Sequence, residues 1–260
     1  MSVTKESAPG EQERGQLISS QYYPSGELSD PPITQARGHW IFFGIERVAA
    51  LLLFILLSPL ITLVALAVKL ESPFDPIFYR QERVGKDRRR VRQLRNTPTD
   101  GETTARRERR TTPGEGQPFM IWKFRTMVPD AEAKTGPVWA SEDDPRITRV
   151  GRMLRYLRLD ELPQLINVFL GQMRLIGPRP ERGYFIEELI RKIPDYRRRL
   201  SVPPGITGLA QVERHYDSNI DDVRTKIRYD VFYVENRSKL MDIKILIKTI
   251  GVVLRGRGAR

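Results

Sequence analysis

An acidic pair, Asp160-Glu161, begins the stretch of this chain whose residue types are best suited to catalysis. Apolar residues follow the pair at helical spacing, at Leu162, Leu165, Ile166, Phe169, Leu170 and Met173. This spacing predicts an amphipathic helix with Asp160 as its N-cap, and Pro163 is acceptable because the first turn of a helix does not use its own amide donors. The free N–H groups of a helix start favour ionised carboxylates and nearby phosphate.

Two adjacent carboxylates at such a helix start can divide the work of catalysis. One can act as a nucleophile while the other binds a metal ion. A simpler interpretation is that Asp160 only caps the helix and that Glu161 is a solvated acid in its first turn. The spacing alone favours this simpler interpretation, so a catalytic role needs evidence from other parts of the sequence.

Five blocks of the sequence provide that evidence. They are Lys123–Met127, Asp144–Thr148, Leu159–Leu165, Gly177–Pro180 and Pro204–Gln211. In this order the blocks closely resemble the bacterial sugar transferases that are monotopic phosphoglycosyl transferases, and the resemblance extends from about Tyr79 to Gly251. Members of that family transfer a sugar 1-phosphate from a nucleotide diphosphate sugar to polyprenyl phosphate, the first membrane step of exopolysaccharide, O-antigen or glycoconjugate assembly.

The resemblance implies a role for each member of the acidic pair. The residue that matches Asp160 attacks the sugar-linked phosphate, which gives a covalent aspartyl-phosphosugar intermediate and releases UMP, and polyprenyl (undecaprenyl) phosphate then resolves the intermediate. Glu161 is the expected ligand of Mg2+, which needs only one or two carboxylates beside substrate phosphate. Arg179 lies in the stiff segment Gly177–Pro180 and is expected to bind phosphate bidentately.

Further basic residues are candidates for substrate binding, namely Lys123, Arg125, Arg146 and Arg214. The first three would also serve as surface ion-pair partners. Where the resembled family often has Asn-Gly-Arg after Gln211-Val212, this chain has Glu213-Arg214-His215, so Arg214 would fill the basic role one position away. Because related family members act on different UDP-sugars, glucose, galactose and an N-acetylated sugar all remain open as the donor sugar.

Composition limits the classes of function that the 260 residues can have. A formal net charge of +12 predicts anionic partners, which include nucleic acid, phosphorylated substrates and acidic lipid surfaces. The absence of cysteine excludes a thiolate nucleophile, a thiolate metal site and disulfides, and it agrees with a reducing cytoplasm. With only two histidines, His39 and His215, a histidine-rich zinc site and a Ser-His-Asp triad have little support.

An uncharged run from Val48 to Val68 matches the ~20 residues of a membrane helix, so we predict a membrane segment over residues 39–70. Ser58-Pro59 lies at its middle, where the missing proline donor fits either a kink in a crossing helix or a re-entrant hairpin. Basic residues flank both ends of the run, and such flanks prefer the cytoplasmic side. The flanks and the resemblance both favour the hairpin, which would hold the protein at the cytoplasmic face of the bacterial inner membrane.

Three regions lie outside the membrane segment. Residues 1–38 are polar with little apolar periodicity, so they are predicted to be a flexible arm. Residues 71–260 are predicted to form a small, mainly helical α+β catalytic domain on the membrane surface. Within this domain Lys86–Gln117 is rich in arginine and departs from the resembled family, so we predict a mobile basic insertion there.

Periodicity predicts the elements that would hold the site. Phe119–Met127 alternates like a strand, and Arg149–Leu157 has helical spacing that leaves arginines such as Arg155 free for another face. Asp221–Val234 is predicted to be a polar helix. Leu240–Leu254 has an apolar face with basic flanks, so it suits an amphipathic helix in an interface with anionic lipid as well as it suits an ordinary core helix.

Two other functions remain open. A metal-dependent membrane glycosyltransferase would use Asp160 and Glu161 only as metal ligands and would release UDP instead of UMP. A non-catalytic, membrane-anchored scaffold would use its arginine-rich surface to bind nucleic acid or acidic lipid. Against the scaffold stand the lack of a recognised nucleic-acid motif and the gathering of acidic and basic residues around one predicted helix start, so no nucleic-acid partner is expected.

Overall fold

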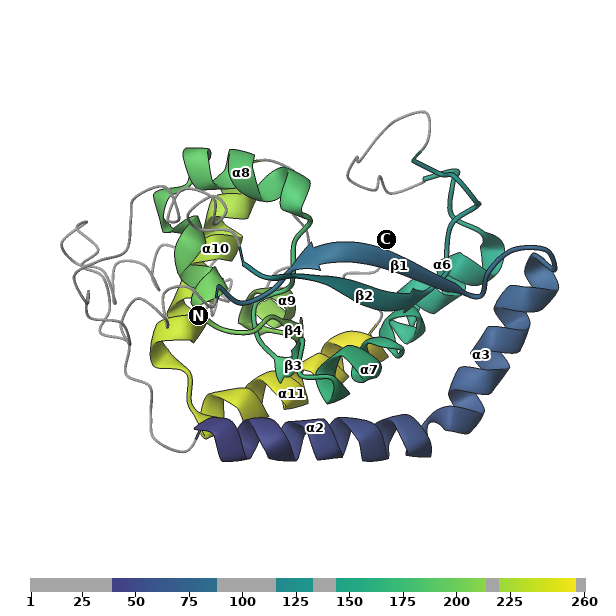
Figure 1. Ribbon diagram of the computed structural model, residues 1–260, viewed down its shortest axis with the longest axis horizontal. Helices are drawn as coiled ribbons and strands as arrows, with labels where there is room; N and C mark the ends of the chain where they lie inside the picture. Colours follow the sequence, from purple (N-terminus) through teal and green to yellow (C-terminus); the bar gives the residue numbers. More distant parts are fainter. Residues whose placement is uncertain (1–38, 88–115, 133–143, 214–219, 256–260) are drawn as a thin grey trace, which may run out of the picture.

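The computed structural model describes residues 39–87, 116–132, 144–213 and 220–255. Within them the chain is mostly helical and contains two small sheets, which confirms the predicted α+β class. Helices α2 (His39–Leu56) and α3 (Ser58–Glu71) form a bent pair, and the strands and the other helices lie on the inner side of the bend (Figure 1). The arm predicted over residues 1–38 lies outside the described residues.

Helices α2 and α3 are separated by Leu57, and their axes are bent by 61°. Pro59 lies in the first turn of α3, where a residue without an N–H donor causes no loss, so the break falls at the predicted position. The Ser58 carbonyl accepts a hydrogen bond from Thr62 Oγ1 at 2.9 Å. No single helix among the described residues has the length and apolar character of a membrane span, whereas this bent pair meets both criteria when its helices are taken together.

Strands β1 (Phe78–Val84) and β2 (Pro118–Phe124) form an antiparallel pair. The pairing continues beyond the strands, because Gly85 N–H donates to the Gln117 carbonyl at 2.9 Å and Gln117 N–H donates to the Lys86 carbonyl at 3.2 Å. The two ends of the predicted basic insertion therefore lie side by side at the end of this hairpin. The residues between them are outside the described part of the chain.

Strands β3 (Arg174–Ile176) and β4 (Gly205–Thr207) form a parallel pair. Gly177 follows β3 directly, and a Cβ atom there would lie 2.7 Å from the Pro203 carbonyl oxygen, so glycine permits this approach of two backbone segments. The other helical elements, in chain order, are α6 (Arg149–Tyr156), the 3-10 turn η1 (Leu159–Glu161), α7 (Gln164–Phe169), α8 (Gly183–Lys192), the 3-10 helix η2 (Pro194–Ser201), α9 (Leu209–Glu213), α10 (Ile220–Asn236) and α11 (Lys239–Leu254).

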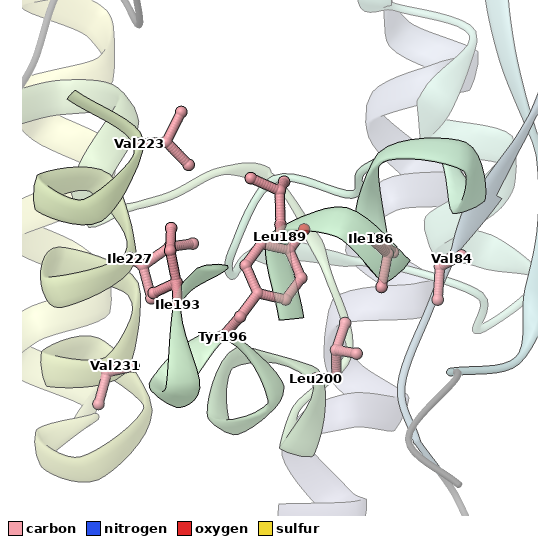
Figure 2. Packing of buried hydrophobic residues seen from close by; sticks show 9 residues of the cluster. All are labelled: Val84, Ile186, Leu189, Ile193, Tyr196, Leu200, Val223, Ile227 and Val231. Carbon is pink, nitrogen blue, oxygen red and sulfur yellow. The ribbon is translucent and has the colours of Figure 1, made fainter. Parts of the chain in front are cut away.

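A buried apolar cluster packs η2 against α8 and α10 (Figure 2). Tyr196 of η2 is fully buried in this cluster with Leu189 of α8 and Ile227 of α10. Val223 and Val231 lie one turn before and one turn after Ile227, so the helix that was predicted to be polar presents a buried apolar stripe.

The chain around the acidic pair differs from the prediction. Asp160 and Glu161 lie in the 3-10 turn η1, which follows Arg158 in the left-handed region at φ 58°. The prediction that Asp160 is the N-cap of a continuous helix is wrong, because Pro163 holds the N-cap position of α7. Glu161 N–H bonds to the carbonyl of Arg158, three residues earlier, and bonds of this span make a turn tighter than an α-helix.

Helix α7 buries a polar side chain that the apolar spacing did not indicate. Asn167 is fully buried, its Oδ1 accepts a hydrogen bond from Trp122 N–H at 3.0 Å, and its Nδ2 donates to the Met120 carbonyl at 2.7 Å and to Gln172 Oε1 at 2.6 Å. These bonds attach α7 to the backbone of β2. Phe169, which was predicted to be buried, is 39% exposed.

Helix α11 turns most of its apolar residues outward. Ile245 is buried, whereas the exposed large apolar residues of the helix are Leu240, Ile243, Leu246, Ile247, Ile250 and Leu254. The described part of the chain leaves this face uncovered. Most of the apolar residues of this helix therefore lie outside the core of the described chain.

Replacing Asn167 by Leu is expected to lower the thermal midpoint of unfolding, because Trp122 N–H and the Met120 carbonyl then lose their partners. Each such loss costs about 1–3 kcal/mol, so we expect a total of at least about 2 kcal/mol. Gln172→Ala is the matched control, since it removes one of the same hydrogen bonds at an exposed residue. Thermal-shift measurements on purified protein check this, and a midpoint for Asn167→Leu at or above that of Gln172→Ala would contradict it.

Replacing residues 88–115 by Asn-Gly is expected to preserve the fold, because backbone hydrogen bonds already join Gly85 and Lys86 to Gln117. Asn-Gly favours the tight turn that connects antiparallel strands. We expect the free energy of unfolding to stay the same or to rise by up to about 2 kcal/mol, since closing a much shorter loop costs less entropy. Circular dichroism and thermal unfolding measure this, and loss of the cooperative transition would show that the replaced segment belongs to the core.

Candidate active site

Glu161 is the centre of a buried cluster of charged side chains from three parts of the chain. Its Oε1 accepts a hydrogen bond from Lys123 Nζ of β2 at 3.1 Å. Arg179, in the segment after β3, binds the same carboxylate with both terminal nitrogens, Nη1 to Oε2 at 3.2 Å and Nη2 to Oε1. Because Glu161 is 7% exposed and paired twice, its interpretation as a solvated acid is wrong.

The opposite charges in this cluster stabilise one another in their ionised forms. Burial alone would raise the pKa of Glu161, but the charges of Arg179 and Lys123 outweigh burial and hold this pKa well below its ordinary value. Burial lowers the pKa of Lys123, and the neighbouring Glu161 opposes that change. The charge of Glu161 raises the pKa of Arg179. Two cations thus surround one carboxylate, an arrangement that can attract a further anionic group such as phosphate.

The neighbouring carboxylate, that of Asp160, has a different environment. It is also 7% exposed, yet no residue of the described chain donates a hydrogen bond to it. Burial and the charge of Glu161 raise the pKa of Asp160, against smaller effects of Lys123, Arg179 and Arg155. A desolvated carboxylate without donors is more basic than a paired one, and this basicity makes it the better nucleophile of the two.

Arg179 provides the most exposed side of the cluster. Its side chain is 29% exposed, compared with 18% for Lys123 and 9% for Glu161. Pro178 and Pro180 fix their own φ angles on both sides of Arg179, so the backbone that carries this guanidinium has little freedom. A ligand that reaches the carboxylates from solvent would therefore meet Arg179.

Two of the other predicted basic residues pair with acids outside this cluster. Arg125 pairs with Asp75 at 2.7 Å, and Arg146 binds both oxygens of Asp144, with Nε to Oδ1 at 2.8 Å. The ion-pair alternative therefore describes Arg125 and Arg146. Arg214 lies outside the described residues.

Two residues near the acidic pair were not assigned to the site from sequence. Arg155 of α6 donates from Nε to Thr126 Oγ1 at 2.9 Å, and its charge acts on Asp160. Gln164 is 1% exposed, and its Nε2 has no hydrogen-bond partner in the described part of the chain. Helical spacing could have indicated Gln164, which lies four residues after Asp160. Arg155 reaches the site because α6 packs against η1, which spacing alone does not show.

The acidic pair can accommodate a magnesium ion without a dedicated protein cage. Among the described residues no group of three or more His, Asp or Glu side chains could hold a metal ion. Magnesium that binds together with substrate phosphate needs only one or two carboxylates, and Asp160 and Glu161 provide two. A carboxylate has about four acceptor positions, and the bonds from Lys123 and Arg179 leave one free on Glu161 Oε2.

Comparison with known proteins agrees with the resemblance found in the sequence blocks. A family model described as bacterial sugar transferase matches residues 39–97 and 96–256. The UDP-N-acetylgalactosamine-undecaprenyl-phosphate N-acetylgalactosaminephosphotransferase of Aeromonas hydrophila is 41% identical over 217 residues, which are 84% of this chain and 44% of the relative.

Two relatives are named UDP-glucose:undecaprenyl-phosphate glucose-1-phosphate transferase. The protein from Escherichia coli K12 is 36% identical over 207 residues, 79% of this chain and 38% of the relative. The protein from Caulobacter vibrioides is 38% identical over 218 residues, 81% of this chain and 68% of the relative. The chain thus spans less than half the length of the Aeromonas and Escherichia relatives. The extent of these matches shows that the chain belongs to the bacterial sugar transferase family.

Proposed function

We propose that this protein transfers a sugar 1-phosphate from a UDP-sugar to polyprenyl phosphate and releases UMP. The observation that carries the proposal is the asymmetric acidic pair, in which two cations hold Glu161 while Asp160 is buried and accepts no hydrogen bond from the residues that the structure describes. The names of the relatives support the substrate classes, because they combine UDP-N-acetylgalactosamine or UDP-glucose with undecaprenyl phosphate.

The transfer proceeds in two steps at Asp160. A carboxylate oxygen of Asp160 attacks the sugar-linked phosphorus, the bond from this phosphorus to the bridging oxygen breaks, and UMP leaves with the electron pair of that bond. A phosphate oxygen of polyprenyl phosphate then attacks the aspartyl-linked phosphorus, which forms the diphosphate product and restores the Asp160 carboxylate. Each step forms one P–O bond as it breaks another, as in other phosphoryl transfers.

The basic residues around the pair bind and orient the donor. Arg179 has a planar guanidinium that remains partly exposed, which suits bidentate binding of a phosphate group. Lys123 adds a second positive charge on the rigid strand β2. When bound, Mg2+ supplies further neutralisation of the diphosphate charge. Glu161 is the proposed ligand of that ion, and Arg214 remains a candidate for binding the sugar nucleotide.

The two alternative functions have less support. A glycosyltransferase that used Asp160 and Glu161 only as metal ligands would release UDP, whereas the names of the relatives describe transfer of a sugar together with its phosphate, which leaves UMP. A non-catalytic scaffold gains nothing from a buried carboxylate such as that of Asp160, to which the described residues donate no hydrogen bond, because burying an unpaired charge lowers stability. The nucleotide that is released separates the first alternative from the proposal, and the absence of any turnover would favour the second.

We also propose that α2 and α3 form a re-entrant hairpin that holds the protein at the cytoplasmic face of the inner membrane. Both helices expose large apolar side chains, such as Leu56 at 74% and Leu63 at 65%. Helix α11 adds Ile247 at 65% and Leu254 at 82%. Exposed apolar faces of this kind suit contact with lipid, and the basic flanks suit anionic headgroups.

Asp160→Asn is expected to abolish transfer, because the amide lacks the nucleophilic oxygen. Wild-type protein that is incubated with UDP-glucose or UDP-N-acetylgalactosamine in the absence of lipid acceptor should gain the mass of one sugar phosphate and release an equal amount of UMP. Asp160→Asn should do neither. Intact-mass spectrometry and nucleotide chromatography measure both quantities. If UMP appears only with both substrates present and no adduct forms, direct transfer in a ternary complex replaces the proposed intermediate.

Glu161→Gln is the matched variant at the neighbouring position. The thermal midpoints of the two variants should differ, because the two carboxylates have different environments. Glu161→Gln should also lose most activity, and it leaves Lys123 and Arg179 together without their counterion, so we expect a loss of about 3 kcal/mol or more. Asp160→Asn removes a buried charge to which no described residue donates a hydrogen bond, so it should keep or raise the thermal midpoint. Equal midpoints for the two variants would contradict the different environments assigned to the pair.

The hairpin predicts that both ends of the membrane segment face the cytoplasm. Because the chain has no cysteine, Ser25→Cys and Glu82→Cys each introduce a single site for labelling. Both sites should be protected from an impermeant thiol reagent added to intact cells, whereas Pro59→Leu should favour a straight, crossing helix and expose the first site. Labelling of Ser25→Cys without the Pro59 change would exclude the hairpin.

A further inference from the structure

The segment Pro178–Glu181, which carries Arg179, is held by its carbonyl oxygens. Four consecutive carbonyls accept hydrogen bonds from β1, β4 and η2: Pro178 from Gly205 N–H at 3.0 Å, Arg179 from Arg199 Nη2 at 2.7 Å, Pro180 from Arg83 Nη1 at 3.2 Å and Glu181 from Val84 N–H at 2.9 Å. Two of the four residues are prolines without an N–H, so acceptor bonds are the main means of fixing this segment.

Arg199 holds the carbonyl of Arg179 itself. Its side chain is almost completely buried, and its Nε donates to Asp230 Oδ2 of α10 at 2.9 Å. Its Nη1 donates to the hydroxyl of Tyr196 at 3.0 Å. The guanidinium of Arg199 therefore connects α10 and η2 to the backbone of Arg179, the residue that binds Glu161.

Stability alone does not account for this buried ion pair. Replacing a buried ion pair by apolar residues of similar volume is often neutral or stabilising, because the pair must offset the loss of hydration of both charges. The apolar cluster around Tyr196 already packs η2 against α10 (Figure 2). An apolar side chain at position 199 could not donate a hydrogen bond to the Arg179 carbonyl, as Arg199 does.

We propose that Arg199, oriented by Asp230, is a positioning residue for the transfer reaction. By fixing the backbone of Arg179, it keeps the Arg179 guanidinium in its two-bond contact with Glu161 and in one orientation toward the donor diphosphate. This role rests on the proposed function. It extends the site to a residue 20 positions after Arg179 and to a partner a further 31 positions along the chain.

The test replaces the ion pair instead of breaking it. Arg199→Met combined with Asp230→Leu removes the donor to the Arg179 carbonyl and both buried charges together, so the fold should be kept. The control variant combines Arg198→Met with Glu235→Leu, which removes the neighbouring ion pair between the same two elements, η2 and α10. Any effect of weaker docking between η2 and α10 should appear in both variants.

The pair variant should change the segment and the reaction, with only a modest effect on global stability. It leaves the Tyr196 hydroxyl and the Arg179 carbonyl without the Arg199 donor, so the thermal midpoint should be somewhat lower than in the wild type while unfolding stays cooperative. Hydrogen exchange of the Val84 and Gly205 amides, which donate to the Glu181 and Pro178 carbonyls, should be faster. With UDP-sugar and polyprenyl phosphate, kcat/KM should fall about 10- to 100-fold, mostly through kcat, because small misplacements of binding groups have effects of this size. The control variant should keep wild-type exchange and kcat/KM.

An Arg179→Ala background shows whether Arg199 acts through Arg179. In that background the pair replacement should cause no further loss of kcat/KM, whereas an equal further loss would overturn the proposal. Unchanged exchange and unchanged kcat/KM in the pair variant would also overturn it. Arg199→Lys, which keeps a charge but loses the fork geometry of three simultaneous bonds, serves with the same readouts if the pair variant does not fold.

Hydrogen exchange needs no substrate, so it separates the two proposals. If the wild type shows no transfer with any UDP-sugar, the proposed function is wrong, while faster exchange of the Val84 and Gly205 amides in the pair variant still supports the role of Arg199 in fixing the segment. If the wild type is active and the pair variant equals it in both measurements, the positioning role is wrong and the proposed function stands.

Discussion

Lys123 lies 38 residues before Glu161 and Arg179 lies 18 residues after it, yet both bind the same carboxylate. Three partly buried charges are tolerated only where the ions stay in close contact, because the loss of hydration of each charge must be offset at short range. Strand β2, turn η1 and the segment after β3 must therefore each be held in place before the cluster can form. Much of the surrounding structure can be understood from this requirement.

Near the cluster, buried polar side chains hold these elements in position through hydrogen bonds. Asn167 attaches α7 to the backbone of β2, and Arg199 attaches the segment of Arg179 to η2 and α10. Gly177 lets that segment approach the chain before β4 more closely than a side chain would permit. Apolar clusters pack the helices against one another, but hydrogen bonds fix register and orientation, since a buried donor or acceptor tolerates few alternative partners.

Features with a local cause could be predicted from the sequence. Proline at position 59 removes a donor in any surroundings, and alternation over β2 is sufficient for a strand, so the helix break and the strand were both predicted. Residue types and spacing indicated the acidic pair, and the family resemblance supplied the roles expected of its two members. Features decided by distant partners were missed, such as the burial of Asn167 against β2 and the packing of α6 against η1 that brings Arg155 to the site.

The two members of the acidic pair have different environments. Successive side chains of the 3-10 turn η1 point about 120° apart, so these two adjacent residues face different parts of the structure. Glu161 meets Lys123 and Arg179, whereas Asp160 meets no donor from the described chain. Such differences assign distinct roles to paired carboxylates, because they push the two pKa values apart. Here the difference comes from the elements that approach the turn, because β2 and the segment after β3 bring Lys123 and Arg179 to Glu161 and no described element brings a donor to Asp160.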